Sequence, residues 1–201
     1  VVGIFLGCSY TDPTSKQKRF SQYWPASTAA GDAQAYICDD PDAIFQAAIC
    51  STGTTLAYAG QWAVGKNVGV LQNTGSTSTG DSALAVGGAA PAAAAAIMRV
   101  VGIVPASAVS TTASGTTSGS STTVTLAAAN SNIAKYMTVT GTGISAGNYV
   151  SNISGTTLTL SVAVNLASAT TLTFTGSPEV LVKFNFGWHS YYNGTGAAVA
   201  T

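Results

Sequence analysis

Residues 138–161 read TVTGTGISAGNYVSNISGTTLTLS and contain no Lys, Arg, Asp or Glu. Small polar residues alternate here with Val, Ile or Leu, which is the period of a strand with one face in a core and one in water. The glycines of Gly141-Thr142-Gly143 and Ser154-Gly155 fall between the alternating runs, where turns require positive backbone angles. The stretch therefore predicts antiparallel β structure whose surface is solvated by hydroxyl groups instead of charges.

The same chemistry extends over residues 105–176, of which 17 are Thr, 12 are Ser and 7 are Gly, and Lys135 is the sole charged residue. Thr suits strands because its branched side chain packs well on a pleated surface. Residues 110–121, STTASGTTSGSS, show no apolar periodicity and predict a flexible linker. Five alternating runs at regular spacing predict an antiparallel barrel or sandwich, at residues 122–126, 136–140, 149–153, 156–160 and 170–174.

The flanking parts of the chain also predict strands, at residues 1–8, 33–38, 44–49, 84–86, 97–104 and 180–186. Because residues 97–104 lead into the Thr-rich segment and residues 180–186 lead out of it, the simplest closure pairs these two strands. The segment is then an insertion in a hairpin, of the kind that exposed loop tips tolerate. The Ala-rich residues 89–96 favour a loop or a single helical turn, because the run is too short for a helix that is stable alone.

We therefore expect an all-β protein with two domains. Residues 1–104 together with 177–201 form a discontinuous host domain, a small β-barrel or sandwich. Residues 105–176 form an inserted antiparallel β-sandwich-like module. The composition changes abruptly at both boundaries, since the host domain carries the other 13 charged residues, all three Trp and the only His.

The charge balance excludes several classes of partner. Seven basic and seven acidic side chains give a formal net charge of zero, whereas proteins that neutralise phosphates carry a clustered basic surface, so we expect no nucleic-acid partner. No run of 18 or more apolar residues exists, and we expect no membrane partner. Cys8, Cys38 and Cys50 match no zinc or redox spacing and are interpreted as free thiols in a reducing cytosol.

The sequence offers little for catalysis. A triad needs a nucleophile, a base and an orienting acid, and His189 is the only imidazole. No nucleophile-elbow pattern or phosphate-binding glycine loop occurs, so we expect no enzyme activity and no cofactor. The Asp39-Asp40-Pro41-Asp42 cluster lacks the longer acidic loop and the distal Glu of a calcium site, which favours a capped turn and no metal.

Aromatic residues are the remaining candidates for recognition. They gather in RFSQYWP (residues 19–25) and in KFNFGWHSYY (residues 183–192). Tyr and Trp are favoured at protein interfaces because they combine a large rigid area with one polar group. Packing in the host core and stacking against sugar rings remain as alternatives. The candidate residues for a contact with a partner protein or a contact between copies are Phe20, Tyr23, Trp24, Trp188, His189, Tyr191 and Tyr192.

Several phrases of the chain resemble small structural proteins of tailed bacteriophages that decorate, or cement, the head shell. They are GIFLGCSYTDP (residues 3–13), FSQYWPASTAAGDAQAYICDDPDAIFQA (residues 20–47) and VGKNVGVLQNTGSTSTGDSALAV (residues 64–86). The inserted module is similar to β modules that recur in phage virion proteins. The resemblance departs at residues 89–96, which match nothing in the pattern.

The resemblance implies a structural function based on contact area. Such a protein is assembled in the bacterial cytoplasm and binds the outer surface of the capsid. It stabilises the shell by bridging neighbouring major capsid protein subunits, often as a trimer. The alternative is a tail or head-fibre component that binds glycans or the host surface. A third hypothesis, a cysteine or serine hydrolase, would require His189 to be essential for turnover.

Overall fold

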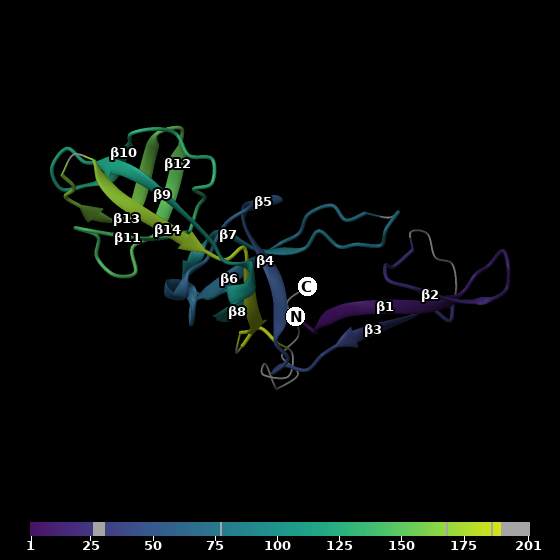
Figure 1. Cartoon of the computed structure of the whole chain (residues 1–201). Coiled ribbons are helices and arrows are strands. Elements are labelled where there is room, and N and C mark those ends of the chain that lie inside the picture. Colours follow the sequence, from purple (N-terminus) through teal and green to yellow (C-terminus); the bar gives the residue numbers. More distant parts are fainter. Residues whose placement is uncertain (26–30, 77, 168, 186, 190–201) are drawn as a thin grey trace.

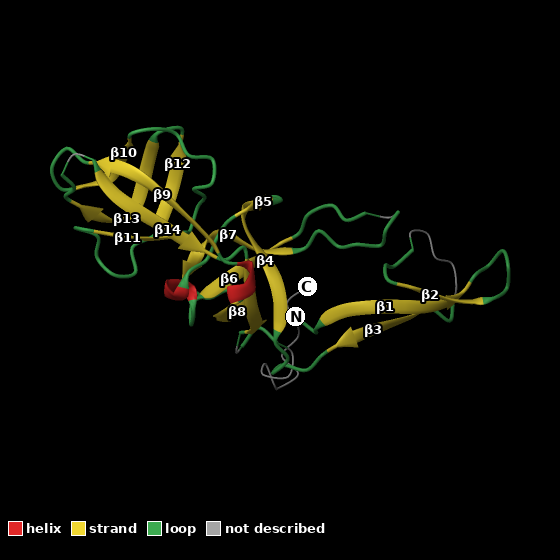
Figure 2. Cartoon of the chain, in the orientation of Figure 1, coloured by secondary structure: helices red, strands yellow, loops and turns green. Residues whose placement is uncertain are grey.

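The computed structural model describes residues 1–25, 31–76, 78–167, 169–185 and 187–189. These residues form fifteen β-strands and two short 3-10 turns, with no α-helix among them (Figures 1 and 2). The expected all-β class is therefore confirmed. The strands fall into three sheets, which we call the arm, the barrel and the module.

The barrel is a closed ring of five strands. β4 pairs with β15, β15 with β8, β8 with β6, β6 with β7, and β7 returns to β4 as the only parallel pair in the described part of the sheet. A short strand, β5, extends β4 outside the ring. The strands are β4 (Phe45–Thr52), β5 (Thr55–Leu56), β6 (Asn67–Leu71), β7 (Ala85–Ala92), β8 (Met98–Ile103) and β15 (Glu179–Phe184).

Apolar side chains fill this ring from every strand. Ile49, Val100, Val180 and Val182 are completely buried there, and Phe45 meets Phe184 edge to face at 5.7 Å between ring centroids. Alternation explains the pattern, since along β15 buried and half-buried residues follow each other from Glu179 onward.

The module is inserted between two paired strands of the barrel. β8 and β15 pair antiparallel, with Val180 opposite Ile103 and Phe184 opposite Met98, which confirms the expected closure. The six module strands form one antiparallel sheet in the order β11-β14-β9-β10-β13-β12. They are β9 (Val109–Thr116), β10 (Ser121–Leu126), β11 (Thr138–Gly141), β12 (Val150–Ser154), β13 (Thr157–Val164) and β14 (Thr170–Gly176).

This sheet curls until its two edges meet. Thr138 bridges Tyr149, and the Val139 amide donates to the Asn148 carbonyl at 2.9 Å, so β11 and β12 close the sheet into a second small barrel. The alternation seen in the sequence places the Thr residues outside and the larger residues inside. The core contains Val124, Leu126, Val139, Val150, Leu158, Leu160, Leu172 and Phe174.

One local prediction was wrong, and another was wrong for half of its range. Residues 110–121 were expected to be a flexible linker, but β9 takes up residues 110–116 of this range and pairs with β14 from Val109 to Gly115. A full-length ladder partner stabilises this polar strand, which has no apolar period of its own. Residues 89–96 were expected to be a loop or helical turn. β7 continues to Ala92, because pairing with β6 overrides the helix preference of Ala, whereas residues 93–96 form a loop as expected.

The arm is a three-stranded antiparallel sheet in the order β2-β1-β3. It consists of β1 (Ile4–Thr11), β2 (Lys18–Ser21) and β3 (Gln34–Cys38), and it projects from the barrel on the side opposite to the module (Figure 1). β1 runs from the barrel toward the tip, where residues 12–17 turn back into β2. β3 then returns toward the barrel and leads into β4.

At the junction of the barrel and the module, side chains of each part pack against the core of the other. Trp62, in the 3-10 turn Gln61–Ala63, stacks on Tyr149 of the module at 3.8 Å between ring centroids, and its Nε1 donates to the Tyr136 carbonyl at 3.1 Å. Tyr136 and Tyr149 thereby join the barrel core, while Tyr58 of the barrel packs against the module core. Burial raises the pKa of Tyr136, with a smaller contribution from Tyr149. The reciprocal packing holds the module in one orientation.

Candidate contact surface

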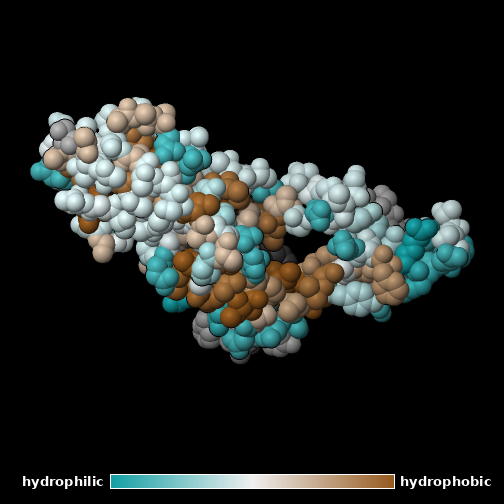
Figure 3. Space-filling view, viewed as in Figure 1, coloured by the Kyte–Doolittle hydropathy of each residue, from teal (hydrophilic) through white to brown (hydrophobic). Residues whose placement is uncertain are grey.

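The part of the chain before β4, which includes the arm, carries most of the large hydrophobic residues that are exposed. Ten of the fifteen large hydrophobic residues that are exposed in the described part of the chain lie before β4. Figure 3 shows hydrophobic surface where the arm meets the barrel. A soluble monomer rarely leaves such a patch uncovered. The seven on the arm strands and just beyond β2 are Phe5, Leu6, Phe20, Tyr23, Trp24, Tyr36 and Ile37.

The register of the sheet assigns these side chains to two faces. On the face that we call the Tyr36 face, Ser9 lies opposite both Phe20 and Gln34, and Gly7 lies opposite Tyr36. On the other face, which we call the Ile37 face, Phe5 lies opposite Ile37. Apolar side chains thus emerge on both faces, as in a strand that is covered on both sides.

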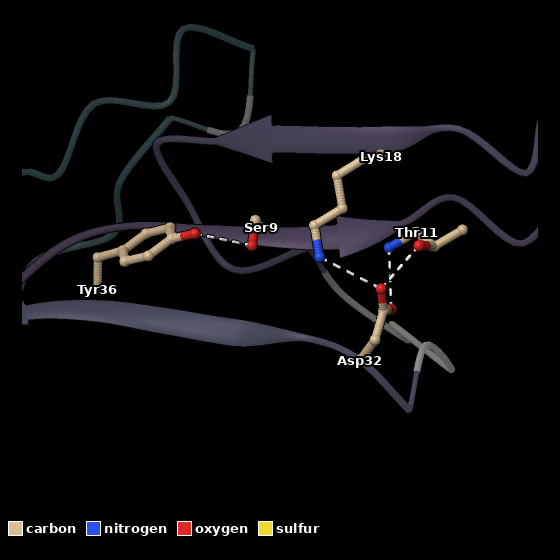
Figure 4. Close-up of polar contacts among 5 residues, drawn as sticks. All are labelled: Ser9, Thr11, Lys18, Asp32 and Tyr36. Carbon is tan, nitrogen blue, oxygen red and sulfur yellow. Dashed lines mark hydrogen bonds and ion pairs between the residues drawn. The ribbon is translucent and has the colours of Figure 1, made fainter.

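The Tyr36 face forms a shallow hollow above a buried hydroxyl. Ser9 is completely buried, and its Oγ shares a 3.0 Å hydrogen bond with the Tyr36 hydroxyl (Figure 4). The hollow has a volume of about 260 Å³ and is lined by Leu6, Gly7, Phe20 and Tyr36 among others. Gly7 has a φ of 141° at the bulge of β1, and a Cβ there would lie 2.8 Å from the Ser21 carbonyl oxygen. The bulge therefore requires Gly, and it opens the floor of the hollow.

The tip of the same face is polar and tightly bonded. Asp32 accepts hydrogen bonds from the Thr11 hydroxyl at 2.7 Å and the Thr11 amide at 3.0 Å, and it pairs with Lys18 at 3.3 Å (Figure 4). The two hydrogen bonds from Thr11, with Lys18 next, lower the pKa of Asp32 from 3.8 to about 2. These contacts fasten the chain just before β3 to β1 and β2.

The Ile37 face is partly covered near the tip. Tyr10 and Arg19 of the arm line one cavity, of about 290 Å³, together with Ser78, Thr79 and Gly80 of the loop between β6 and β7. Arg19 is also paired with Asp12 at 2.9 Å. The loop therefore lies beside the arm at this end.

The predicted aromatic residues lie in two places. Phe20 is 76% exposed on β2, and Tyr23 and Trp24 follow it at 41% and 49%. Trp188 is 43% exposed at the base of the arm, where its carbonyl accepts a 2.9 Å hydrogen bond from the N-terminal amine of Val1.

His189 does not face outward. It is completely buried, with its ring 5.1 Å from that of Phe184, so its expected role at an interface is corrected to packing in the barrel. Tyr191 and Tyr192 lie outside the described residues. The Asp39 to Asp42 turn is capped as expected, because the Asp40 carboxylate accepts from the Asp42 amide at 2.8 Å.

Sequence reasoning missed Leu6 and Tyr36. The signal for them is the two-sided apolar pattern of IFL and AYI, which usually marks a strand buried on both faces. Within the described ranges, no three His, Cys, Asp or Glu side chains are grouped so that they could hold a metal ion. No helix in that part is long and apolar enough to cross a membrane.

Comparisons of the chain with protein-family models, with curated proteins and with solved structures gave no match.

Proposed function

We propose that this chain is a structural virion protein of a tailed bacteriophage. In this proposal it binds the outer surface of the capsid and bridges neighbouring major capsid protein subunits. The observation that carries the proposal is the arm: a projecting sheet with apolar side chains on both faces and open outer edges on β2 and β3. Such a sheet is stable when another surface covers it.

The arm offers two kinds of contact to a partner. Burial of each large apolar side chain, such as that of Phe20, contributes about 1.5–3 kcal/mol to the free energy of binding. Its outer edges offer unpaired backbone groups, to which an extended segment of a partner can add as a strand. A large and mainly apolar protein surface, such as the interface between capsid subunits, would provide both the apolar contact and the strand pairing.

Repetition on a lattice strengthens such contacts. Each bound copy adds a link between subunits, and self-association as a trimer would convert later contacts into intramolecular ones with a high effective concentration. The module adds little charge to the outer coat, because Lys135 is the only charged residue between 105 and 176.

The proposal is tested on particles of the encoding phage that lack this chain. Purified protein is added back as wild type, as Phe20→Lys, and as Thr123→Lys, which places the same charge on an exposed strand position of the module. We expect wild type and Thr123→Lys to bind and to raise the temperature of DNA release, measured with a DNA-binding dye. Phe20→Lys should bind at least tenfold more weakly, because burial of a Lys in an apolar contact is costly.

Two results would contradict the proposal. One is equal DNA-release temperatures with and without bound wild-type protein. The other is a copy number in purified particles that matches a tail position instead of the capsid lattice, which would favour the glycan-binding or host-binding alternative.

A further inference from the structure

A cleft lies where the barrel meets the module. Its volume is about 440 Å³, which is within the range of small-molecule sites, about 300–1,000 Å³. β5 and Tyr58 of the barrel form one wall. The start of β9 and the loop before β11 form the other. The lining residues are Thr55, Leu56, Tyr58, Val109, Ser110, Thr111, Ser131, Asn132 and Ala134.

The chemistry of this lining is neutral and rich in hydrogen-bonding groups. It contains four hydroxyl side chains of Ser or Thr, one amide, one phenol and no Lys, Arg, Asp, Glu or His. The side chains of Thr55, Ser131 and Asn132 make no hydrogen bond to other described residues, which leaves them available to a ligand. Leu56 and Val109 add exposed apolar surface, at 46% and 42%. A strongly charged ligand would find no counter-charge here.

The backbone of β9 adds two further groups. The carbonyls of Thr112 and Ser114 point away from β14, since they accept from the Asn130 side chain at 3.2 Å and from the Ala127 amide at 2.9 Å. Because backbone direction repeats every second residue in an antiparallel pair, the N–H and C=O of Ser110 point to the same side. β10 pairs with β9 only at Gly115 and Thr116, so it does not cover Ser110.

This open edge is too short for an added peptide strand. Asn130 binds both the Thr111 hydroxyl and the Thr112 carbonyl and so blocks the edge on one side of Ser110. The 3-10 turn Pro105–Ser107 ends the strand on the other side. One donor and one acceptor remain, surrounded by hydroxyls, an amide and a tyrosine. That set matches the alternating hydroxyl groups and apolar faces of a sugar ring.

We propose that this cleft binds an uncharged carbohydrate. Ser110, Ser131 and Asn132 supply hydrogen bonds to the sugar hydroxyls, and Tyr58 with Leu56 supplies the apolar wall. A second hollow of about 260 Å³, which is also lined by Ser131, lies next to this cleft. The capsid-binding proposal does not require this site.

The test is a titration of the full chain, labelled with ¹⁵N, with a panel of neutral di- and trisaccharides that includes glucose, galactose and N-acetylglucosamine units. We expect at least one sugar to shift the amide signals of Ser110 and Asn132 in a saturable manner. Asn132→Ala should weaken binding about tenfold, as loss of one hydrogen bond of about 1–1.5 kcal/mol predicts. Asn152→Ala, on the exposed side of β12, is the matched control and should bind as wild type.

The inference is overturned if no sugar in the panel shifts these amides, or if Asn132→Ala binds as tightly as Asn152→Ala. It is also overturned if an extended peptide displaces a bound sugar and binds more tightly, because the cleft would then be a peptide site. The Asn132→Ala protein should still bind to phage particles that lack the chain. Failure of the sugar site and failure of the capsid proposal are therefore seen in separate assays.

Discussion

Replacement of Trp62 by Ala should release the module from the barrel. The indole ring stacks on Tyr149 with an interplanar angle of 9°, meets Tyr136 edge to face at 6.5 Å, and lies 4.8 Å below the Lys66 ammonium group. Its Nε1 also donates to the Tyr136 carbonyl. One side chain therefore makes four separate contacts, three of them across the junction.

The magnitude follows from these contacts. Each aromatic pair contributes about 0.5–1.5 kcal/mol beyond its buried area, and the hydrogen bond about 1 kcal/mol. Truncation of a large buried aromatic residue costs about 3–5 kcal/mol, and since Trp62 is only partly buried we expect about 3 kcal/mol. Trp62→Phe keeps a ring on Tyr149 and loses the hydrogen bond, so it should cost about 1 kcal/mol.

The assay is calorimetry combined with urea unfolding followed by circular dichroism. We expect wild type to unfold with the two barrels coupled, and Trp62→Ala to show two separated transitions. A double-mutant cycle with Tyr149→Ala should give a coupling energy of about 1 kcal/mol. A coupling energy near zero, or equal losses for the Ala and Phe variants, would refute the assignment of the junction to this stack.

Three further outcomes follow from local contacts. Thr11→Val should raise the pKa of Asp32 from about 2 toward 3.8, as measured by NMR titration of the carboxylate. In wild type the contribution of Asp32 to stability is complete above pH 3.8 and is lost as the pH falls to about 2, so in the variant the contribution should be smaller and its loss should be complete at a higher pH. Asn148→Ala should lower the free energy of unfolding, measured in urea, by about 2–4 kcal/mol. The buried Asn148 side chain accepts hydrogen bonds from the Ser161 hydroxyl and the Val162 amide and donates one to the Val162 carbonyl. The exposed control Asn152→Ala should cost less than about 0.5 kcal/mol. Gly60→Ala should lower the melting temperature, because its methyl group would overlap the Thr138 side chain across the junction; an unchanged melting temperature would contradict the close approach.

The strands of the module could be predicted wherever large and small residues alternate. β9 could not, because its inward-facing positions include Ala113 and Gly115, which carry no apolar signal. A Cβ on Gly115 would lie 2.7 Å from Val124 Cγ1, so larger neighbours already fill that part of the core. Small residues facing inward therefore made a core strand resemble a linker.

The candidate surface was predictable in part. The clustering of Phe20, Tyr23 and Trp24 indicated an aromatic surface near residue 20, and the structure exposes all three. Leu6 and Tyr36 were missed because their place on one face depends on the bulge between Phe5 and Gly7, which shifts the register of β1 against β3. A shift of one residue changes the face of every later side chain, and composition alone does not reveal it.

The separation of the two surfaces has a mechanical consequence. The apolar arm and the hydroxyl-rich module extend from opposite sides of the barrel (Figure 1), and the exchanged tyrosines of the junction resist rotation between barrel and module. A partner that covers the arm would therefore fix the direction of the module as well. Because the module is solvated by Thr and Ser instead of charge, salt would alter its surface little, whereas attachment through the arm would depend on apolar area. Binding of the chain to particles should accordingly change little between low and high salt, and a steep loss of binding with salt would show that charged groups, and not the arm faces, make the contact.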